Sequence, residues 1–138
     1  MNNKRNVKTL VSDCLLLVLS LLLCLGTKFI FHACPGPMES GMWMSCHWAE
    51  QAVAGIGAAL SVTAVINLIL KKQSTKNGLV TAMIPTALLA ALTPNVLIKL
   101  CMMKDMQCHT HMRPAVIVIS LLIVIVSAVY VLINRKAD

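Results

Sequence analysis

Four apolar segments, each about as long as a bilayer is thick, constrain this chain more than any other feature. They cover residues 10–31, 51–70, 79–100 and 114–133. A helix needs about 20 apolar residues to cross the hydrocarbon core of a membrane. Isolated strands would leave unpaired backbone groups in lipid, and the alternating pattern of barrel strands is absent. The sequence therefore predicts an all-α fold, a bundle of four transmembrane helices.

Composition and charge support a single membrane domain over residues 1–138. The chain is 58% hydrophobic and 12% charged, whereas about a quarter of the residues in an average soluble domain are charged. Its net charge of +7 could indicate nucleic-acid binding, but the basic residues form no stripe with interleaved aromatic residues. They lie instead at the ends of apolar segments. We therefore expect the lipid bilayer, and no nucleic acid, as a partner.

The positions of the basic residues predict the orientation in the membrane. Four crossings place eight of them on one side, while Lys28, Lys99, Lys104 and Arg113 lie on or near the other. An excess of Lys and Arg marks the cytoplasmic side, so both termini are expected in the cytoplasm and the protein in the cytoplasmic (inner) membrane. The eight are Lys4, Arg5, Lys8, Lys71, Lys72, Lys76, Arg135 and Lys136.

The two halves of the chain resemble each other. Each is a helical hairpin, over 9–70 and 79–134, and each outer loop contains a cysteine followed by Met-x-Cys-His. Two halves with an even number of spans have the same orientation and are related by an axis along the membrane normal. We expect the two Met-x-Cys-His segments to face each other near that axis.

Inside the membrane the sequence predicts packing rather than chemistry. Small residues of the second segment, such as Gly55 and Ala59 at i and i+4, allow helices to approach closely. Pro85 and Pro94 are expected to bend the third segment. Asp13 lies near the cytoplasmic end of the first segment and is expected to reach lipid headgroups, which leaves no ionisable residue at mid-membrane depth and disfavours an ion pathway. We expect Cys14 and Cys24 of the first segment to be inert packing.

The outer loops, 32–49 and 101–113, concentrate sulfur and imidazole. They contain all four histidines, four of the six cysteines and seven of the nine methionines. Thiolate and thioether ligands select Cu(I), and imidazole suits copper and zinc. The sequence therefore predicts a Cu(I) site between the loops. Two Cys and two His could instead hold Zn, and because the spacing matches no zinc finger, it does not fix the identity of the metal. The candidate ligands are Cys34, Met44, Cys46, His47, Cys101, Met106, Cys108 and His109.

Two other interpretations of the same cysteines stay open. In an oxidising compartment Cys34, Cys46, Cys101 and Cys108 could form two disulfides, in any of three connectivities. A thiol-disulfide oxidoreductase acting through Cys46 or Cys108 is a lesser alternative, since no Cys-x-x-Cys pair is present. There is no Ser-His-Asp set, phosphate-binding loop or carboxylate pair. We therefore expect no enzyme of a standard hydrolytic or phosphoryl-transfer class.

Both loops carry motifs of a known kind. The segments are Met42-Trp-Met-Ser-Cys-His-Trp48 with Gln51-Ala and Gly55-Ile-Gly57, and then Leu100-Cys-Met-Met, Met106-Gln-Cys-His109 and Arg113-Pro-Ala. The chain thereby resembles a family of small four-helix bacterial membrane proteins, the domain of unknown function 4418 type. The resemblance implies no established activity. It does imply association with ABC exporters of the macrolide-export type. The alternative function is therefore a disulfide-stapled accessory subunit of such a transporter. The expected protein partner is the permease or, in a homo-oligomer, a second copy of this chain.

Overall fold

The computed structural model describes residues 7–30, 45–93, 96 and 111–137. Four helices account for nearly all of them: α1 (Val7–Phe29), α2 (Ser45–Ile69), α3 (Gln73–Leu92) and α4 (Arg113–Ala137). No strand occurs in these residues. The predicted all-α fold is confirmed.

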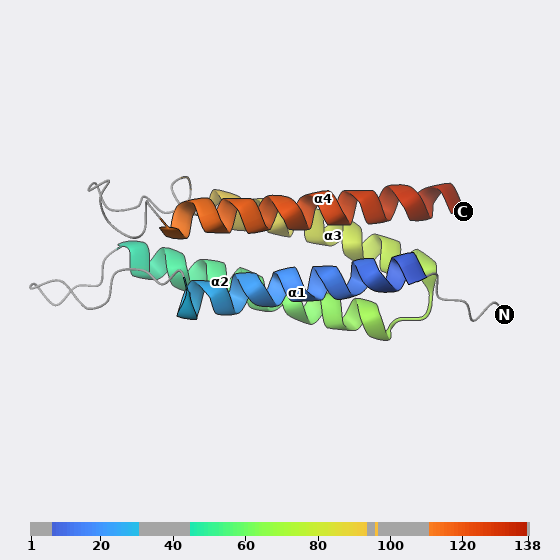
Figure 1. Ribbon diagram of the computed structural model, residues 1–138, viewed down its shortest axis with the longest axis horizontal. Coiled ribbons are helices and arrows are strands. Elements are labelled where there is room, and N and C mark those ends of the chain that lie inside the picture. The colour runs from blue at the N-terminus through green and yellow to red at the C-terminus, as the bar shows by residue number, and fades with distance from the viewer. Residues whose placement is uncertain (1–6, 31–44, 94–95, 97–110, 138) are drawn as a thin grey trace, which may run out of the picture.

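The helices form an antiparallel bundle in which each helix packs against two neighbours (Figure 1). The most extensive contacts join α1 to α2 and α3 to α4, while α1–α4 and α2–α3 are the looser sides. The bundle therefore consists of two hairpins laid side by side, as the sequence predicts. We call the end with Val7, Ala137 and the 70–72 connection the terminal end. The opposite end, where Phe29, Ser45, Leu92 and Arg113 lie, is the loop end (Figure 1).

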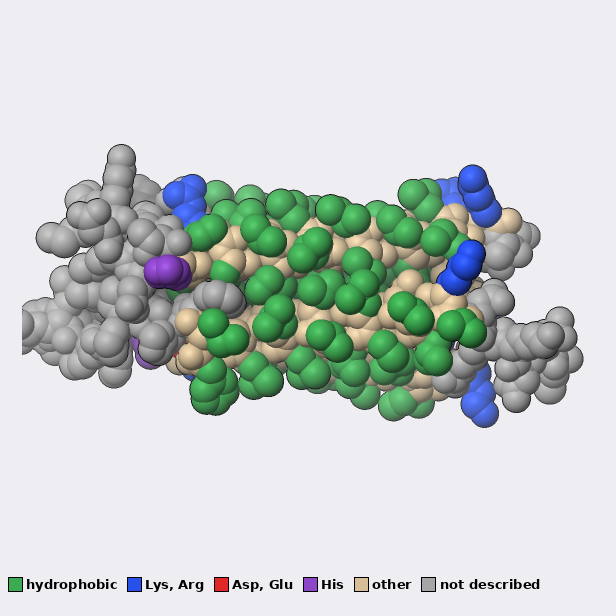
Figure 2. Space-filling model, in the orientation of Figure 1, with side chains coloured by type: hydrophobic (Ala, Val, Ile, Leu, Met, Phe, Trp, Pro, Cys, Tyr) green, Lys and Arg blue, Asp and Glu red, His purple; other side chains and the backbone are tan. Residues whose placement is uncertain are grey.

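The face of the bundle seen in Figure 2 is a belt of hydrophobic side chains, with Lys and Arg side chains near its two ends. Three of the helices, over Val7–Phe29, His47–Ile69 and Arg113–Lys136, are long and apolar enough to span a membrane. Such a surface is suited to lipid tails, where every backbone polar group must be bonded within the helix. The chain is accordingly a helical membrane protein.

Helix α3 differs from the predicted third span. It begins at Gln73 rather than at residue 79, and within the described residues it is not apolar enough to qualify as a span. The early turns carry Gln73, Lys76 and Asn77, and the helix ends at Leu92. Thr93, which precedes Pro94 in the sequence, still has helical backbone angles (φ −55°, ψ −53°), and its N–H donates to the Leu89 carbonyl at 3.0 Å. Residues 97–100 of the predicted span, and Pro94, lie outside the described residues; Pro85 lies inside α3.

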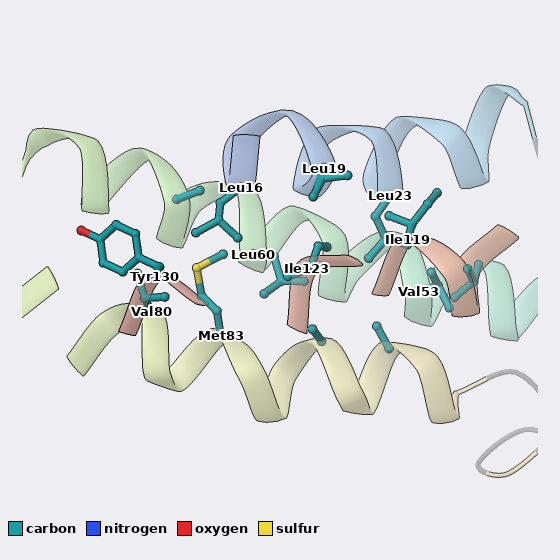
Figure 3. Packing of buried hydrophobic residues seen from close by; sticks show 14 of the residues in the cluster. Leu16, Leu19, Leu23, Val53, Leu60, Val80, Met83, Ile119, Ile123 and Tyr130 are labelled. Atoms are coloured by element: carbon teal, nitrogen blue, oxygen red, sulfur yellow. The ribbon is translucent and has the colours of Figure 1, made fainter. Parts of the chain in front are cut away.

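The core is a column of aliphatic side chains that runs along the bundle axis (Figure 3). Leu16 of α1, Leu60 of α2, Met83 of α3 and Ile123 of α4 are all fully or almost fully buried there. Lipid tails are as apolar as these side chains, so the column stabilises the bundle by close packing rather than by escape from water. Tyr130 closes the column towards the terminal end, and its hydroxyl points away from the aliphatic groups (Figure 3).

Close approach between helices depends on Gly57 rather than on Gly55. A Cβ atom placed on Gly57 would lie 2.8 Å from the backbone nitrogen of Cys24 and 2.9 Å from its Cα atom. A Cβ on Gly55 would meet nothing within 4 Å. A small residue of α2 therefore allows close approach to α1, as predicted, but that residue is Gly57 and not Gly55.

Candidate functional site

Most of the predicted metal ligands lie outside the described residues. These are Cys34, Met44, Cys101, Met106, Cys108 and His109. Cys46 is described only as part of the first turn of α2, and His47 follows it. The residues that the structure describes contain no group of three or more His, Cys, Asp and Glu side chains able to hold a metal ion. The metal site and the disulfides therefore stay predictions.

Residues at the bases of the two loops do lie at one end of the bundle. Histidine side chains are visible at the loop end in Figure 2. His47 stands in the first turn of α2, and its ring meets that of the exposed Trp48 edge-on, at 6.2 Å between centroids. His111 is exposed just before α4, whereas Met112 beside it is fully buried in the core. The exposed imidazole of His111 could contribute to a metal site; the thioether of Met112 could not.

An ion pair joins α1 to α2 near the loop end. The Lys28 Nζ atom lies 3.9 Å from Glu50 Oε1. Lys28 is in the last turn of α1, where a cation suits the helix dipole. Glu50 lies in the second turn of α2, which begins at Ser45. The long distance and the exposed Lys28 side chain make this a weak interaction.

A second polar cluster, at the terminal end, was missed by the sequence analysis. The Asp13 side chain is buried, with 1% of the residue exposed, and Lys76 is 5% exposed. Lys76 Nζ donates to Asp13 Oδ2 at 2.9 Å, and Asn67 Nδ2 donates to Asp13 Oδ1 at 2.7 Å. The expectation that Asp13 reaches lipid headgroups is therefore wrong. Asp13 points inward because it shares a helix face with the buried Leu16 and Leu23.

A second residue of α3, Gln73, and one residue of α4, Tyr130, complete this cluster. Gln73 Nε2 lies 3.4 Å from the hydroxyl oxygen of Tyr130, at the long end of hydrogen-bond distance, and 3.2 Å from Asn77 Oδ1. Tyr130 is also coupled electrostatically to Asp13. Every helix of the bundle thus contributes at least one side chain. We call Asp13, Asn67, Gln73, Lys76 and Tyr130 the terminal-end cluster.

A periodic signal in the sequence could have revealed the inward position of Asp13. Asp13, Ser20 and Thr27 recur every seven residues along α1 and are all buried. Ser20 and Thr27 satisfy their hydroxyls on carbonyl oxygens of their own helix, at Leu16 and Leu23. Asp13 has no such local partner and bonds to α2 and α3 instead. A polar residue at every seventh position, on the same face as buried leucines, predicts that this face packs against other helices.

Comparison with known proteins identifies a family. The family model described as Domain of unknown function (DUF4418) matches residues 16–133. The chain belongs to the DUF4418 family. The match covers both hairpins and four members of the terminal-end cluster, and it begins three residues after Asp13. No curated protein and no solved structure matches this DUF4418 protein.

Proposed function

We propose that this DUF4418 protein binds a soft metal ion, Cu(I), between its two sulfur-rich loops. The observation that carries the proposal is that both loops are attached to the same end of the bundle. The helices that flank each loop, α1 and α2 for one and α3 and α4 for the other, all have their flanking ends at the loop end (Figure 1). Both Met-x-Cys-His segments are therefore tethered to the same end of one bundle.

The tethers are short enough for a shared site. Cys46 and His47 belong to the first turn of α2, and His109 is four residues from the start of α4 at Arg113. Four residues span at most about 14 Å, at roughly 3.5 Å each. Packed helices are about 8–10 Å apart, so this reach is comparable to the width of the bundle end. A site between the hairpins needs no long extension of either loop.

The ligand chemistry favours Cu(I) over harder ions. Thiolates of Cys34, Cys46, Cys101 and Cys108 with thioethers of Met44 and Met106 form a soft donor set. Two thiolates with His47 and His109 would instead suit Zn in a tetrahedral site. No carboxylate-rich set accompanies them: beyond Asp13 and Glu50, the chain has three acidic residues. Ions that prefer oxygen ligands are therefore poor candidates.

Metal binding is tested on the purified, reduced protein in detergent, with Cu(I) supplied through a chromogenic chelator. We expect wild type to remove Cu(I) from a micromolar complex and the double variant Cys46→Ser, Cys108→Ser to fail. The matched control is Cys14→Ser, Cys24→Ser, which removes the two cysteines of α1 and should retain full capacity. If all three proteins take up the same amount of copper, or none, the proposed site is wrong.

The accessory-subunit alternative differs in the state of the same sulfurs. Disulfide-stapled loops would make the four loop cysteines unreactive towards a membrane-impermeant alkylating reagent until they are reduced. A metal site predicts labelling without reduction, blocked when Cu(I) is added. The labelling pattern in intact cells therefore separates metal binding from a stapled loop that serves a transporter partner.

A further inference from the structure

The terminal-end cluster has buried polar atoms whose hydrogen bonds are incomplete. Asn67 Oδ1 is buried without a partner among the described residues, although Nδ2 of the same amide donates to Asp13. Asn134 Nδ2, one helical turn from Tyr130 on α4, is also buried without one. Buried polar groups normally have a partner, and ordered water supplies it where side chains do not. Asn67, a member of the cluster, and Asn134, four residues along α4 from Tyr130, therefore each have one buried polar atom without a partner among the described residues.

A small cavity near the terminal end has Tyr130 in its lining. It lies between α1 and α4, and it is large enough for one water molecule. Its lining consists of Lys8, Thr9, Ser12, Tyr130, Ile133 and Asn134. Lys8 lies in the first turn of α1 and is exposed. Water that enters beside Lys8 can thus reach Tyr130 without crossing the aliphatic column.

From this arrangement we propose that Asp13 is a proton-binding site that exchanges with the water at the terminal end through Tyr130. A hydronium ion in the cavity gives its proton to the Tyr130 oxygen, while the Tyr130 hydroxyl gives its own proton to an Asp13 oxygen. The products are water, an unchanged tyrosine and a neutral carboxylic acid at position 13. Ionisable groups within membrane helices are expensive to keep and commonly mark such sites.

The ammonium group of Lys76 allows Asp13 to lose its proton again. Lys76 is the fourth residue of α3 and the only charged side chain bonded to Asp13 within the described part of the chain. Its flexible stem allows the ammonium group to reach the nearby interface when Asp13 becomes neutral. The other titratable group facing Asp13 is Tyr130 of α4, while α2 presents the neutral Asn67 and α1 presents Lys8 at the cavity. Protonation therefore opens the ion pair that joins the two hairpins.

The alternative is a purely structural cluster in which Asp13 and Lys76 stay ionised at all pH values where the bundle is folded. Infrared spectroscopy distinguishes the two, because a protonated carboxyl has its own C=O band. The sequence has three aspartates, Asp13, Asp105 and Asp138. A variant with Asp105→Asn and Asp138→Asn, grown with aspartate labelled by ¹³C in the side-chain carboxyl, leaves Asp13 as the one labelled aspartate.

We expect the reconstituted variant to develop a label-shifted carboxylic acid band when neutral buffer is exchanged for acidic buffer in which the bundle stays folded, and to lose it on return. Adding Asp13→Asn should abolish the band, while adding Glu50→Gln at the other end should leave it. A folded protein with no label-sensitive band would overturn the proposal. After a rapid pH change, Tyr130→Phe should slow the appearance of the band several-fold; an unchanged rate would show that the proton does not pass through Tyr130.

Discussion

The two ends of this bundle place their polar chemistry in opposite ways. At the loop end the predicted ligands are neighbours in the sequence, as in Met44-Ser-Cys46-His47. At the terminal end Asp13 is bonded to residues 54 and 63 positions away. Composition alone reveals the first kind of site, because unusual residues stand together. The second kind forms only when the helices pack, and no segment of sequence contains it.

The largest test of this difference is removal of Lys76 by Lys76→Met. The change keeps much of the volume but leaves the Asp13 carboxylate buried without its cation. Breaking a buried pair in this way typically costs about 3–5 kcal/mol. We expect a loss of that order in the free energy of unfolding in mixed detergent micelles at neutral pH.

The double variant Asp13→Asn, Lys76→Met is the control for this experiment. Replacing both charges removes the uncompensated carboxylate and keeps a polar group near Asn67. It should recover most of the lost stability, since well-packed neutral residues can replace a buried ion pair at little cost. If Lys76→Met alone proves as stable as wild type, the pair does not join the hairpins in the membrane.

Much of the fold could be predicted because lipid leaves few choices. Four apolar runs predict four helices, and the structure has them, in the predicted hairpins. The ends were less predictable: α2 begins six residues before the predicted span and α3 also six. The extension of α3, from Gln73, is polar, and that of α2, from Ser45, mixes polar with apolar residues. Hydropathy detects the apolar part of a helix and not the turns that continue beyond it.

The direction in which a side chain points is harder to predict than the helix that carries it. The sequence places Asp13 correctly near the end of its helix, but the prediction that its side chain reaches lipid headgroups is wrong. Its burial depends on Lys76 and Asn67, which belong to helices whose packing the sequence does not specify. Gly57 and Gly55 show the same limit, since both are small residues of one helix and only one of them contacts α1.

A second, smaller effect is expected for Gly57→Ala. The added Cβ would lie 2.8 Å from the Cys24 nitrogen, which belongs to the backbone of α1 and cannot move aside alone. Hairpin one must therefore open slightly, at a cost of about 1–3 kcal/mol in the free energy of unfolding. Gly55→Ala is the matched control: its Cβ meets no atom, and alanine favours helix over glycine by up to about 1 kcal/mol. Equal stabilities for the two variants would contradict the close contact.

The smallest effect is expected at the ion pair near the loop end, through Glu50→Gln. Lys28 Nζ is 3.9 Å from the carboxylate, and 39% of the Lys28 side chain is exposed, so water screens the charge that remains. The Glu50 side chain is only 10% exposed, but the pair is long and one partner is in water. We therefore expect a cost close to the about 0–1 kcal/mol of exposed pairs, and well below the about 3–5 kcal/mol for breaking the buried pair. The same unfolding assay compares them directly. If Glu50→Gln cost as much as Lys76→Met, the two ion pairs would be equivalent supports of the bundle, and burial would not be what sets the terminal-end cluster apart.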